Sequence, residues 1–239
     1  MIRAKRSLSQ NFLIDKNISK KIVDQTIVKN KTILEIGPGY GFLTDSILLK
    51  KPKKIILVEK DTNLKEKLYE KYKDNKKVEI IGSDILSLKL NKFKDLIIIS
   101  NLPYNISTKV ILYLFHFNEN IYEMIFMIQK EVAQKFDYNL PKMNKYKFLT
   151  KVVSNFTICF DISSKVFVPK PKVKSSLVKF EFKRKNFNLE KANSFSKKIF
   201  KNIRKKISNN LKIKLPDPLL DKRVNEISIN DLMRIYDFF

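Results

Sequence analysis

The chain is poor in the residues that build disulfide frameworks and zinc sites. Its 239 residues include one cysteine, Cys159, and one histidine, His116. A single cysteine excludes an internal disulfide framework, and one cysteine with one histidine argues against a zinc site. We therefore expect no metal centre, with Cys159 as a small core residue and His116 as an ordinary helix residue.

Long apolar runs are also missing. The longest aliphatic runs, such as those at 97–99 and 125–128, have the length of a strand. The basic residues Arg3, Lys5 and Arg6 are not followed by the apolar segment of a secretory signal. We expect a cytoplasmic protein with no membrane association. At 44% hydrophobic residues, the chain can form one large core and a small second domain.

Acidic residues are scarce relative to basic ones. The chain has 49 lysines and arginines against 24 acidic residues, a net charge of +25, and only six of the basic residues are arginine. A lysine excess can follow from AT-rich codon usage, so the total alone indicates little about function. A charge this large nevertheless attracts polyanions at moderate salt.

Glycine is scarce and concentrated in one place. The four glycines are Gly37, Gly39, Gly41 and Gly82. Three of them follow a predicted strand at 32–36 and precede a predicted helix at 42–50. A glycine-poor chain that collects glycine at such a turn needs unusual backbone geometry or close backbone approach there. The N-terminus of the following helix is then available to a ligand.

Short apolar strands alternate with helical segments through most of the chain. We predict strands at 32–36, 54–59, 78–81, 95–100 and 123–128, and helices at 16–28, 42–50, 62–73 and 107–116. This alternation predicts an α/β fold, a parallel sheet with helices on both faces. After a loop at 139–147, strands at 157–162 and 176–182 are expected as an antiparallel pair at the sheet edge.

From about Arg184 the pattern is helical only. Apolar residues recur every fourth position, at Phe195, Ile199, Ile203, Ile207 and Leu211, which predicts one helix with an apolar stripe. Its opposite face carries six basic residues: Lys197, Lys198, Lys201, Arg204, Lys205 and Lys206. That face is either solvated or in contact with RNA, and both interpretations stay open. We expect a catalytic domain at 1–183 and a small helical domain at 184–239.

Acidic residues stand at two further strand ends. Glu59 closes the second strand, where a carboxylate can accept from both hydroxyls of a ribose, and Asp84 follows the third, where it can accept from an adenine amino group. The glycine spacing is G-x-G-x-G, not the G-x-G-x-x-G of dehydrogenases. Pro38 also lacks an N–H that a pyrophosphate could use. These features favour S-adenosylmethionine, which has no diphosphate, over a nicotinamide dinucleotide.

The segment Ser-Asn-Leu-Pro-Tyr-Asn at 100–105 follows the apolar run at 96–99. It falls at the carboxyl edge of the predicted sheet, where open α/β sheets bind ligands. Pro103 fixes the turn and lacks an N–H, so neighbouring carbonyls are free to accept. Asn101 adds a side-chain carbonyl and Tyr104 a flat ring. Together they predict methyl transfer to an amino group of adenine, cytosine or glutamine.

Seven segments carry a resemblance to a known family. They are Gln-Asn-Phe-Leu at 10–13, Glu-Ile-Gly-Pro-Gly at 35–39, Val-Glu-Lys-Asp at 58–61, Gly-Ser-Asp at 82–84, Asn-Leu-Pro-Tyr-Asn-Ile-Ser-Thr at 101–108, Gln-Lys-Glu-Val-Ala at 129–133 and Phe-Val-Pro-Lys-Pro-Lys-Val at 167–173. In this order they resemble the rRNA adenine dimethyltransferases, which include a universal small-subunit enzyme and macrolide-resistance enzymes of the large subunit. The resemblance covers 9–182 and is weaker beyond.

The resemblance implies a Rossmann-like class I S-adenosylmethionine-dependent methyltransferase fold with a small helical C-terminal domain that docks on rRNA or the ribosome. It also implies which residues bind the cofactor, and these are Asn11 and Leu13 on its methionine side, Gly37 and Gly39 along its backbone, Glu59 at the ribose, Asp84 at the adenine, and Asn101. No metal is implied. Asn11 and Leu13 rest on the resemblance alone.

The catalytic set implied is Asn101, Leu102, Pro103, Tyr104 and Phe167. Accepting both amino protons, at the Asn101 side chain and a Leu102 or Pro103 carbonyl, would aim the nitrogen lone pair at the methyl group, so alignment and electrostatics replace a general base. Tyr104 would stack on the extruded base, a contact worth ~1–3 kcal/mol. Phe167 is a candidate for the other face of the base and equally for a core aromatic.

The Asn-Leu-Pro-Tyr sequence and Asn105 favour the small-subunit branch. The expected activity is dimethylation of N6 in two adjacent adenosines near the 3′ end of 16S rRNA, by a monomer acting on the small ribosomal subunit or its precursor. The alternatives are a 23S rRNA enzyme of the macrolide-resistance type and an assembly factor that acts mainly by binding. The expected RNA contacts are Arg3, Lys5, Arg6, Lys170, Lys172, Lys201, Arg204 and Lys205.

Overall fold

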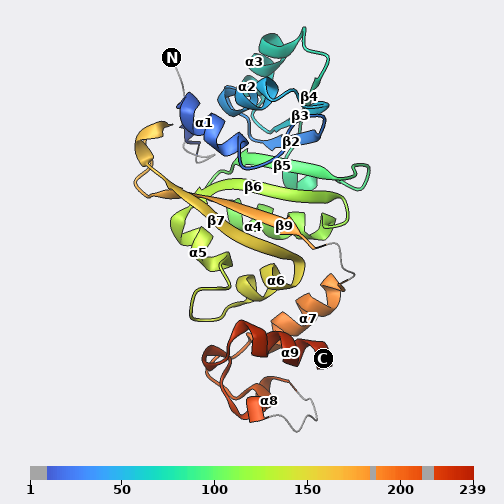
Figure 1. Ribbon diagram of the computed structural model, residues 1–239, viewed down its shortest axis with the longest axis vertical. Helices are drawn as coiled ribbons and strands as arrows, with labels where there is room; N and C mark the ends of the chain where they lie inside the picture. Colours follow the sequence, from blue (N-terminus) through green and yellow to red (C-terminus); the bar gives the residue numbers. More distant parts are fainter. Residues whose placement is uncertain (1–9, 184–186, 212–217) are drawn as a thin grey trace. The chain divides into compact units, whose positions relative to one another are not determined.

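The computed structural model describes residues 10–183, 187–211 and 218–239 (Figure 1). The chain divides into two compact units, which we call the first and the second unit. The first consists of Met1–Val132 and Ile158–Phe182, and the second of Ala133–Thr157 and Lys183–Phe239. Residues 133–157, which the sequence pattern assigns to the first domain, therefore group with the C-terminal segment. The boundary residue Arg184 lies outside the described residues, and the functional roles of the two parts stay a prediction.

A seven-stranded sheet has the order β4-β3-β2-β5-β6-β9-β7. Its strands are β2 (Thr32–Ile36), β3 (Lys54–Glu59), β4 (Val78–Gly82), β5 (Leu96–Asn101), β6 (Ile121–Gln129), β7 (Ser154–Ile162) and β9 (Ser175–Phe182). The five strands from β4 to β6 are parallel neighbours, and β9 pairs antiparallel with β6. The predicted parallel sheet is confirmed, as is the pairing of the last two strands at its edge. A separate two-stranded ladder joins β1 (Phe12–Leu13) to β8 (Phe167–Val168).

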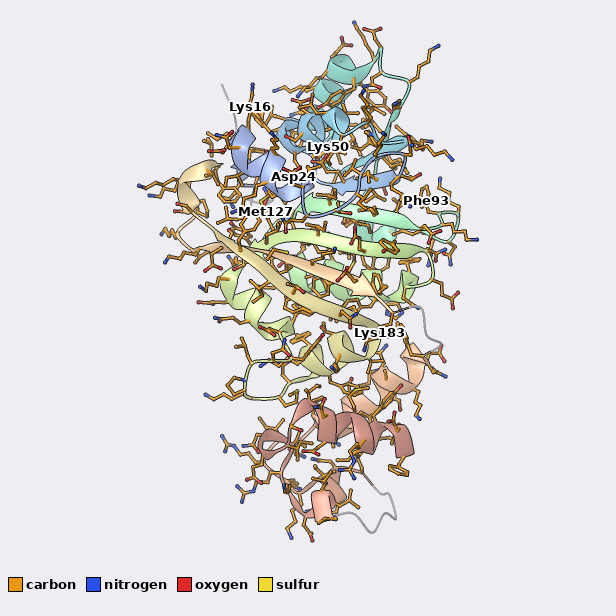
Figure 2. All side chains as sticks on the ribbon, in the orientation of Figure 1. Lys16, Asp24, Lys50, Phe93, Met127 and Lys183 are labelled. Carbon is orange, nitrogen blue, oxygen red and sulfur yellow. The ribbon has the colours of Figure 1, made fainter. Side chains whose placement is uncertain are left out.

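The helices of the first unit cover the sheet with their apolar sides. They are α1 (Lys16–Val23), α2 (Phe42–Leu49), α3 (Thr62–Tyr72) and α4 (Ser107–Leu114). The helix α5 (Lys130–Phe136) begins at the end of β6 and contains residues of both units. Residues Ile22, Ile47 and Leu68 of α1, α2 and α3 share one core cluster with alternate residues of the strands. The Asp24–Lys50 ion pair, 2.5 Å long, joins the C-terminal ends of α1 and α2 (Figure 2). Among the described helices, none combines the length and the apolar character that a membrane span requires.

An aromatic cluster holds the second unit together. The helices α6 (Lys145–Val153), α7 (Leu189–Ile199) and α9 (Ile229–Phe238) meet through Phe148, Phe195 and Tyr236. Ring centroids lie 5.0–5.3 Å apart, within the favourable range for aromatic pairs. The buried Lys147 donates its ammonium to the carbonyl oxygens of Leu140 and Pro141, at 2.7 and 2.6 Å, and so secures the loop ahead of α6.

The single helix predicted over 195–211 is wrong. Helix α7 ends at Ile199, and the short helix α8 (Ile207–Asn210) begins after a turn in which Lys205 N–H donates to Asn202. Ile203, a member of the predicted stripe, is 44% exposed, whereas the rest of the stripe is buried. A continuous helix would stack like charges at three- and four-residue spacing through the basic segment, which is unfavourable. The turn avoids this and still lets Ile207 pack inward.

Candidate active site

A cavity of about 260 Å³ opens at the carboxyl ends of the parallel strands of the first unit. Its lining comes from the residues that follow β2, β3, β4 and β5, together with the segment at 10–12. Parallel strands bring these ends to one edge of the sheet, which is why residues far apart in sequence meet there. The cavity lies at the sheet edge where the strand-end pattern predicts a site, and the roles of its residues stay a prediction.

The glycine-rich turn after β2 forms one wall of the cavity. Gly37, Gly39 and Gly41 all have φ between +61° and +79°, the left-handed region that favours glycine. A Cβ at Gly37 would meet no atom within 4 Å, whereas at Gly39 it would lie 2.6 Å from the Phe12 ring. Gly37 N–H donates to Val58 O at 2.8 Å, which ties the turn to β3. The turn thus presents bare backbone to whatever occupies the cavity.

Beneath this turn lies a buried carboxyl group. Glu35, near the end of β2, is 2% exposed and accepts a hydrogen bond from the Thr44 hydroxyl at 2.6 Å. Burial raises the pKa of Glu35 to about 8, although the bond from Thr44 acts against this. The carboxyl is therefore held mainly in its neutral form at pH 7.

Glu59 stands where β3 ends and is held on both oxygens. Gly39 N–H donates to Oε2 at 3.2 Å and Asp61 N–H donates to Oε1 at 2.9 Å, and the side chain is buried. Burial raises the pKa of Glu59, with the two backbone bonds opposing the rise. A carboxylate oriented in this way can accept from two adjacent hydroxyl groups, the role predicted for it at a ribose.

Asp84 follows β4 and is the more solvated of the two acidic residues. Leu86 N–H donates to its Oδ1 at 3.0 Å, and the Lys60 ammonium lies 2.9 Å from its Oδ2. Partial burial acts to raise the pKa of Asp84, but the bond from Leu86 and the charge and bond of Lys60 together lower it. Asp84 is thus a stable anion at the cavity. Lys60 also lines the cavity, a role that only its position next to Glu59 could have suggested.

Asn101 is the last residue of β5. The nitrogen of its side-chain amide has a hydrogen-bond partner, whereas the oxygen has none among the described residues. Its Nδ2 donates to the backbone carbonyl of Asn11 at 2.6 Å. Its Oδ1 is buried and has no hydrogen-bond partner among the residues described. Buried polar atoms without a partner are rare and costly, and in a cavity wall they point to a ligand donor. The amide oxygen of Asn101 is therefore an acceptor without a partner in a residue that lines the cavity, and its role in catalysis stays a prediction.

The turn after Asn101 is secured at both ends. Leu102 N–H donates to Met127 O at 3.1 Å, and Pro103 O accepts from Ile106 N–H at 3.2 Å. Because Pro103 O already has a partner, the carbonyl of Leu102 is the stronger candidate for a second acceptor. Tyr104 lines the cavity, and its hydroxyl lies 2.6 Å from Ser175 Oγ.

Phe167 does not join the other predicted site residues. It is 2% exposed, pairs with Leu13 across the β1–β8 ladder and belongs to the hydrophobic core. It is absent from the residues that line the cavity. The structure therefore favours the core role for Phe167. Leu13 lies in the same core and reaches only a smaller hollow, which it shares with Gly37 and Asn101.

The predicted RNA contacts fall into three groups. Arg3, Lys5 and Arg6 lie outside the described residues. Lys170 and Lys172 are exposed between β8 and β9 in the first unit. Lys201, Arg204 and Lys205 are exposed between α7 and α8 in the second unit, and their role in RNA binding stays a prediction.

The sequence of the chain is similar to those of known ribosomal RNA methyltransferases. The family model for ribosomal RNA adenine dimethylases matches residues 1–238. A ribosomal RNA small subunit methyltransferase A from Malacoplasma penetrans (strain HF-2) is 40% identical over 235 residues, which cover 95% of this chain and 84% of the relative. One from Hydrogenobaculum sp. (strain Y04AAS1) is 34% identical over 240 residues and covers 99% of this chain and 94% of the relative.

The fold is also found among solved structures. The crystal structure of the 23S rRNA methyltransferase ErmE aligns with a TM-score of 0.80 at 19% identity, over 95% of this chain and 98% of that one. At this identity the similarity concerns the fold alone. It confirms the Rossmann-like architecture with a helical C-terminal part.

Proposed function

The chain belongs to the ribosomal RNA adenine dimethylase family, and from this we propose that it transfers methyl groups from S-adenosylmethionine to N6 of two adjacent adenosines near the 3′ end of 16S rRNA. The small ribosomal subunit or its precursor would be the substrate particle. The relatives named as small-subunit methyltransferases support this choice, as does the Asn-Leu-Pro-Tyr sequence. We further propose that the enzyme acts as a cytoplasmic monomer.

The observation that carries the proposal is the buried Oδ1 of Asn101, which has no hydrogen-bond partner among the described residues and belongs to a residue that lines the cavity. An adenine amino nitrogen is a poor nucleophile, because its lone pair is delocalised into the ring. When Asn101 Oδ1 accepts one amino hydrogen and Leu102 O the other, the nitrogen becomes pyramidal and its lone pair turns toward the methyl donor. Aligned acceptors of this kind lower a barrier by ~2–4 kcal/mol.

When bound, S-adenosylmethionine supplies an electrophilic methyl group on a sulfonium. The residues of the chain hold and orient the reactants, with Glu59 at the ribose hydroxyls, Asp84 at the adenine amino group and Gly37 in close backbone approach. In each transfer the amino nitrogen would form a bond to the methyl carbon, the bond from that carbon to sulfur would break, and one amino proton would leave to solvent. No side chain of tuned pKa is required for this.

Tyr104 is the platform for the base. Adenosine must leave its stack to reach the cavity, and stacking on an aromatic ring compensates the loss. A second transfer to the same nitrogen requires that the turn also hold a monomethylated base. Because the amino group then has one hydrogen left, one acceptor suffices, and we assign this role to Asn101.

The test uses the protein with labelled S-adenosylmethionine and three substrates, namely unmethylated small subunits, large subunits and naked rRNA. We expect label in N6-dimethyladenosine near the 3′ end of 16S rRNA. Label confined to 23S rRNA would replace the proposal with the macrolide-resistance activity. Tight particle binding without label would favour an assembly factor.

A further inference from the structure

The ring of Tyr104 is anchored by a residue 71 positions away. The Tyr104 hydroxyl lies 2.6 Å from the hydroxyl of Ser175, and either group can be the donor. Tyr104 is on the turn between β5 and α4, and Ser175 is the fully buried first residue of β9. No sequence pattern links these residues, and only the pairing of β9 with β6 brings the serine to the site.

Ser175 offers its hydroxyl from a rigid position. It pairs with Gln129 in the β6–β9 ladder, and the next backbone bond runs from Lys130 N–H to Lys174 O at 3.0 Å. Its neighbour Ser176 donates to Asp161 Oδ1 at 2.7 Å, and the other oxygen of Asp161 lies 2.5 Å from the Lys130 ammonium. The backbone contacts that hold Ser175 at the start of β9 depend neither on Tyr104 nor on the side chain of Ser176.

We infer that Ser175 is a positioning residue for the target base, one that fixes the Tyr104 ring as a stacking platform before the base arrives. The inference rests on the proposed function. A partly buried tyrosine on a turn can rotate about two side-chain bonds, and a bond at its far end restricts both. A platform that is ordered in advance binds a base without the entropic cost of ordering it, which favours transfer.

The chemistry of Tyr104 agrees with this role. Burial raises the pKa of its hydroxyl, although the bond to Ser175 acts against the rise, so the group stays protonated and can keep its bond at working pH. A phenylalanine would supply the same stacking face without an anchor. The hydroxyl of Tyr104 thus serves orientation and takes no part in the chemical step.

A double-mutant cycle tests the inference. Ser175→Ala and Tyr104→Phe each remove the same hydrogen bond, and each should lower kcat/KM for small-subunit rRNA by about five- to tenfold, the usual effect of one neutral hydrogen bond. The double variant should be no worse than either single variant, because both act through one contact. The Kd for S-adenosylmethionine should stay unchanged in all three.

Ser176→Ala is the matched control. Ser176 is equally buried, lies next in the same strand and also loses one side-chain bond, but that bond goes to Asp161. We expect it to lower the melting temperature as Ser175→Ala does and to leave kcat/KM for rRNA at the wild-type value. Tyr104→Phe changes a partly exposed residue, so it reports on the contact even if Ser175→Ala does not fold.

Three results would overturn the inference while leaving the proposed function intact. They are unchanged kcat/KM in Tyr104→Phe, multiplied losses in the double variant, and an equal loss in Ser176→Ala. A wild-type protein that binds the cofactor yet methylates no adenosine would instead overturn the proposed function.

Discussion

The side-chain amide of Asn101 donates to the backbone carbonyl of Asn11 at 2.6 Å. This contact settles how the amide is turned, because the nitrogen must face the carbonyl and the oxygen must then face away from it. The oxygen is the buried atom without a partner among the described residues. An unsatisfied buried acceptor costs about 1–3 kcal/mol of stability, which a donor on the substrate would recover. Asn11 therefore positions the acceptor on which the proposed chemistry depends.

Asn101→Ala should lower kcat by about 10²–10³-fold, the usual effect of losing one aligned group that stabilises a transition state. Binding to the small subunit should be unchanged, because one extruded base is the only part of the particle that Asn101 is proposed to contact. The measurements are single-turnover methyl transfer and particle binding. Asn120→Ala is the control, since Asn120 also donates its amide to backbone carbonyls, those of Asn91 and Phe93, but does not line the cavity. Equal turnover in both variants would contradict the role of Asn101.

Asp84→Ala should raise the Kd for S-adenosylmethionine by about 10–100-fold, because a hydrogen bond to a charged acceptor contributes about 1.5–3 kcal/mol. Calorimetric titration measures the change. Asp24→Ala is the matched control. This variant also removes a carboxylate that is paired with a lysine of the first unit, but Asp24 does not line the cavity. A Kd equal to that of wild type in both variants would exclude Asp84 from cofactor binding.

Glu35→Gln should change how stability depends on pH. The pKa of Glu35 is raised in the folded state to about 8, so its stabilising effect is complete below the unfolded pKa and is lost as pH rises to about 8. Relative to the glutamine variant, the wild-type free energy of unfolding should fall by up to about 1.4 kcal/mol per pH unit from pH 4.5 to 8 and then level off.

Urea denaturation of both proteins at pH 5, 7 and 9 measures this difference. The charged groups that act on Glu35 are Asp45, Lys71 and Glu59, and they are common to both proteins. A difference that does not vary with pH would show that Glu35 is ionised in the folded state.

Lys201→Ala with Lys205→Ala should weaken binding to small-subunit rRNA and flatten its salt dependence. Each lost phosphate contact reduces the slope of log affinity against log salt by about one. Affinities at several salt concentrations measure this. Lys76→Ala with Lys77→Ala carries the same change of charge on exposed residues of the first unit. If both pairs behave alike, the basic segment between α7 and α8 is only solvated.

The strand ends show why much of the site could be predicted. Apolar runs of strand length recur at short spacing, and parallel strands must bring their carboxyl ends to one edge. Gly37, Glu59, Asp84 and Asn101 each follow such a run, so their convergence on one cavity follows from local pattern and topology.

Phe167 shows what pattern reasoning left open, and the predicted helix over 195–211 shows where it failed. A motif aromatic can face a ligand or the core, and its pairing with Leu13 decides for the core. A four-residue apolar spacing describes a helix, but it carries no information on the repulsion among the lysines beside it. The position of Phe167 depends on a neighbour that is distant in sequence. The break in the predicted helix depends on charge repulsion summed over the whole basic segment.

The amino-acid sequence by itself determined the class of fold, the acidic and amide groups at the strand ends and the family to which the chain belongs. Local hydrophobic patterns and short motifs are sufficient to identify all three. The tertiary structure alone decided how the side chains of Asn101 and Tyr104 are oriented in the site. Asn11 reaches Asn101 over 90 positions and Ser175 reaches Tyr104 over 71, and such contacts form only when strands pair. These two contacts fix the orientation of the Asn101 amide and of the Tyr104 ring.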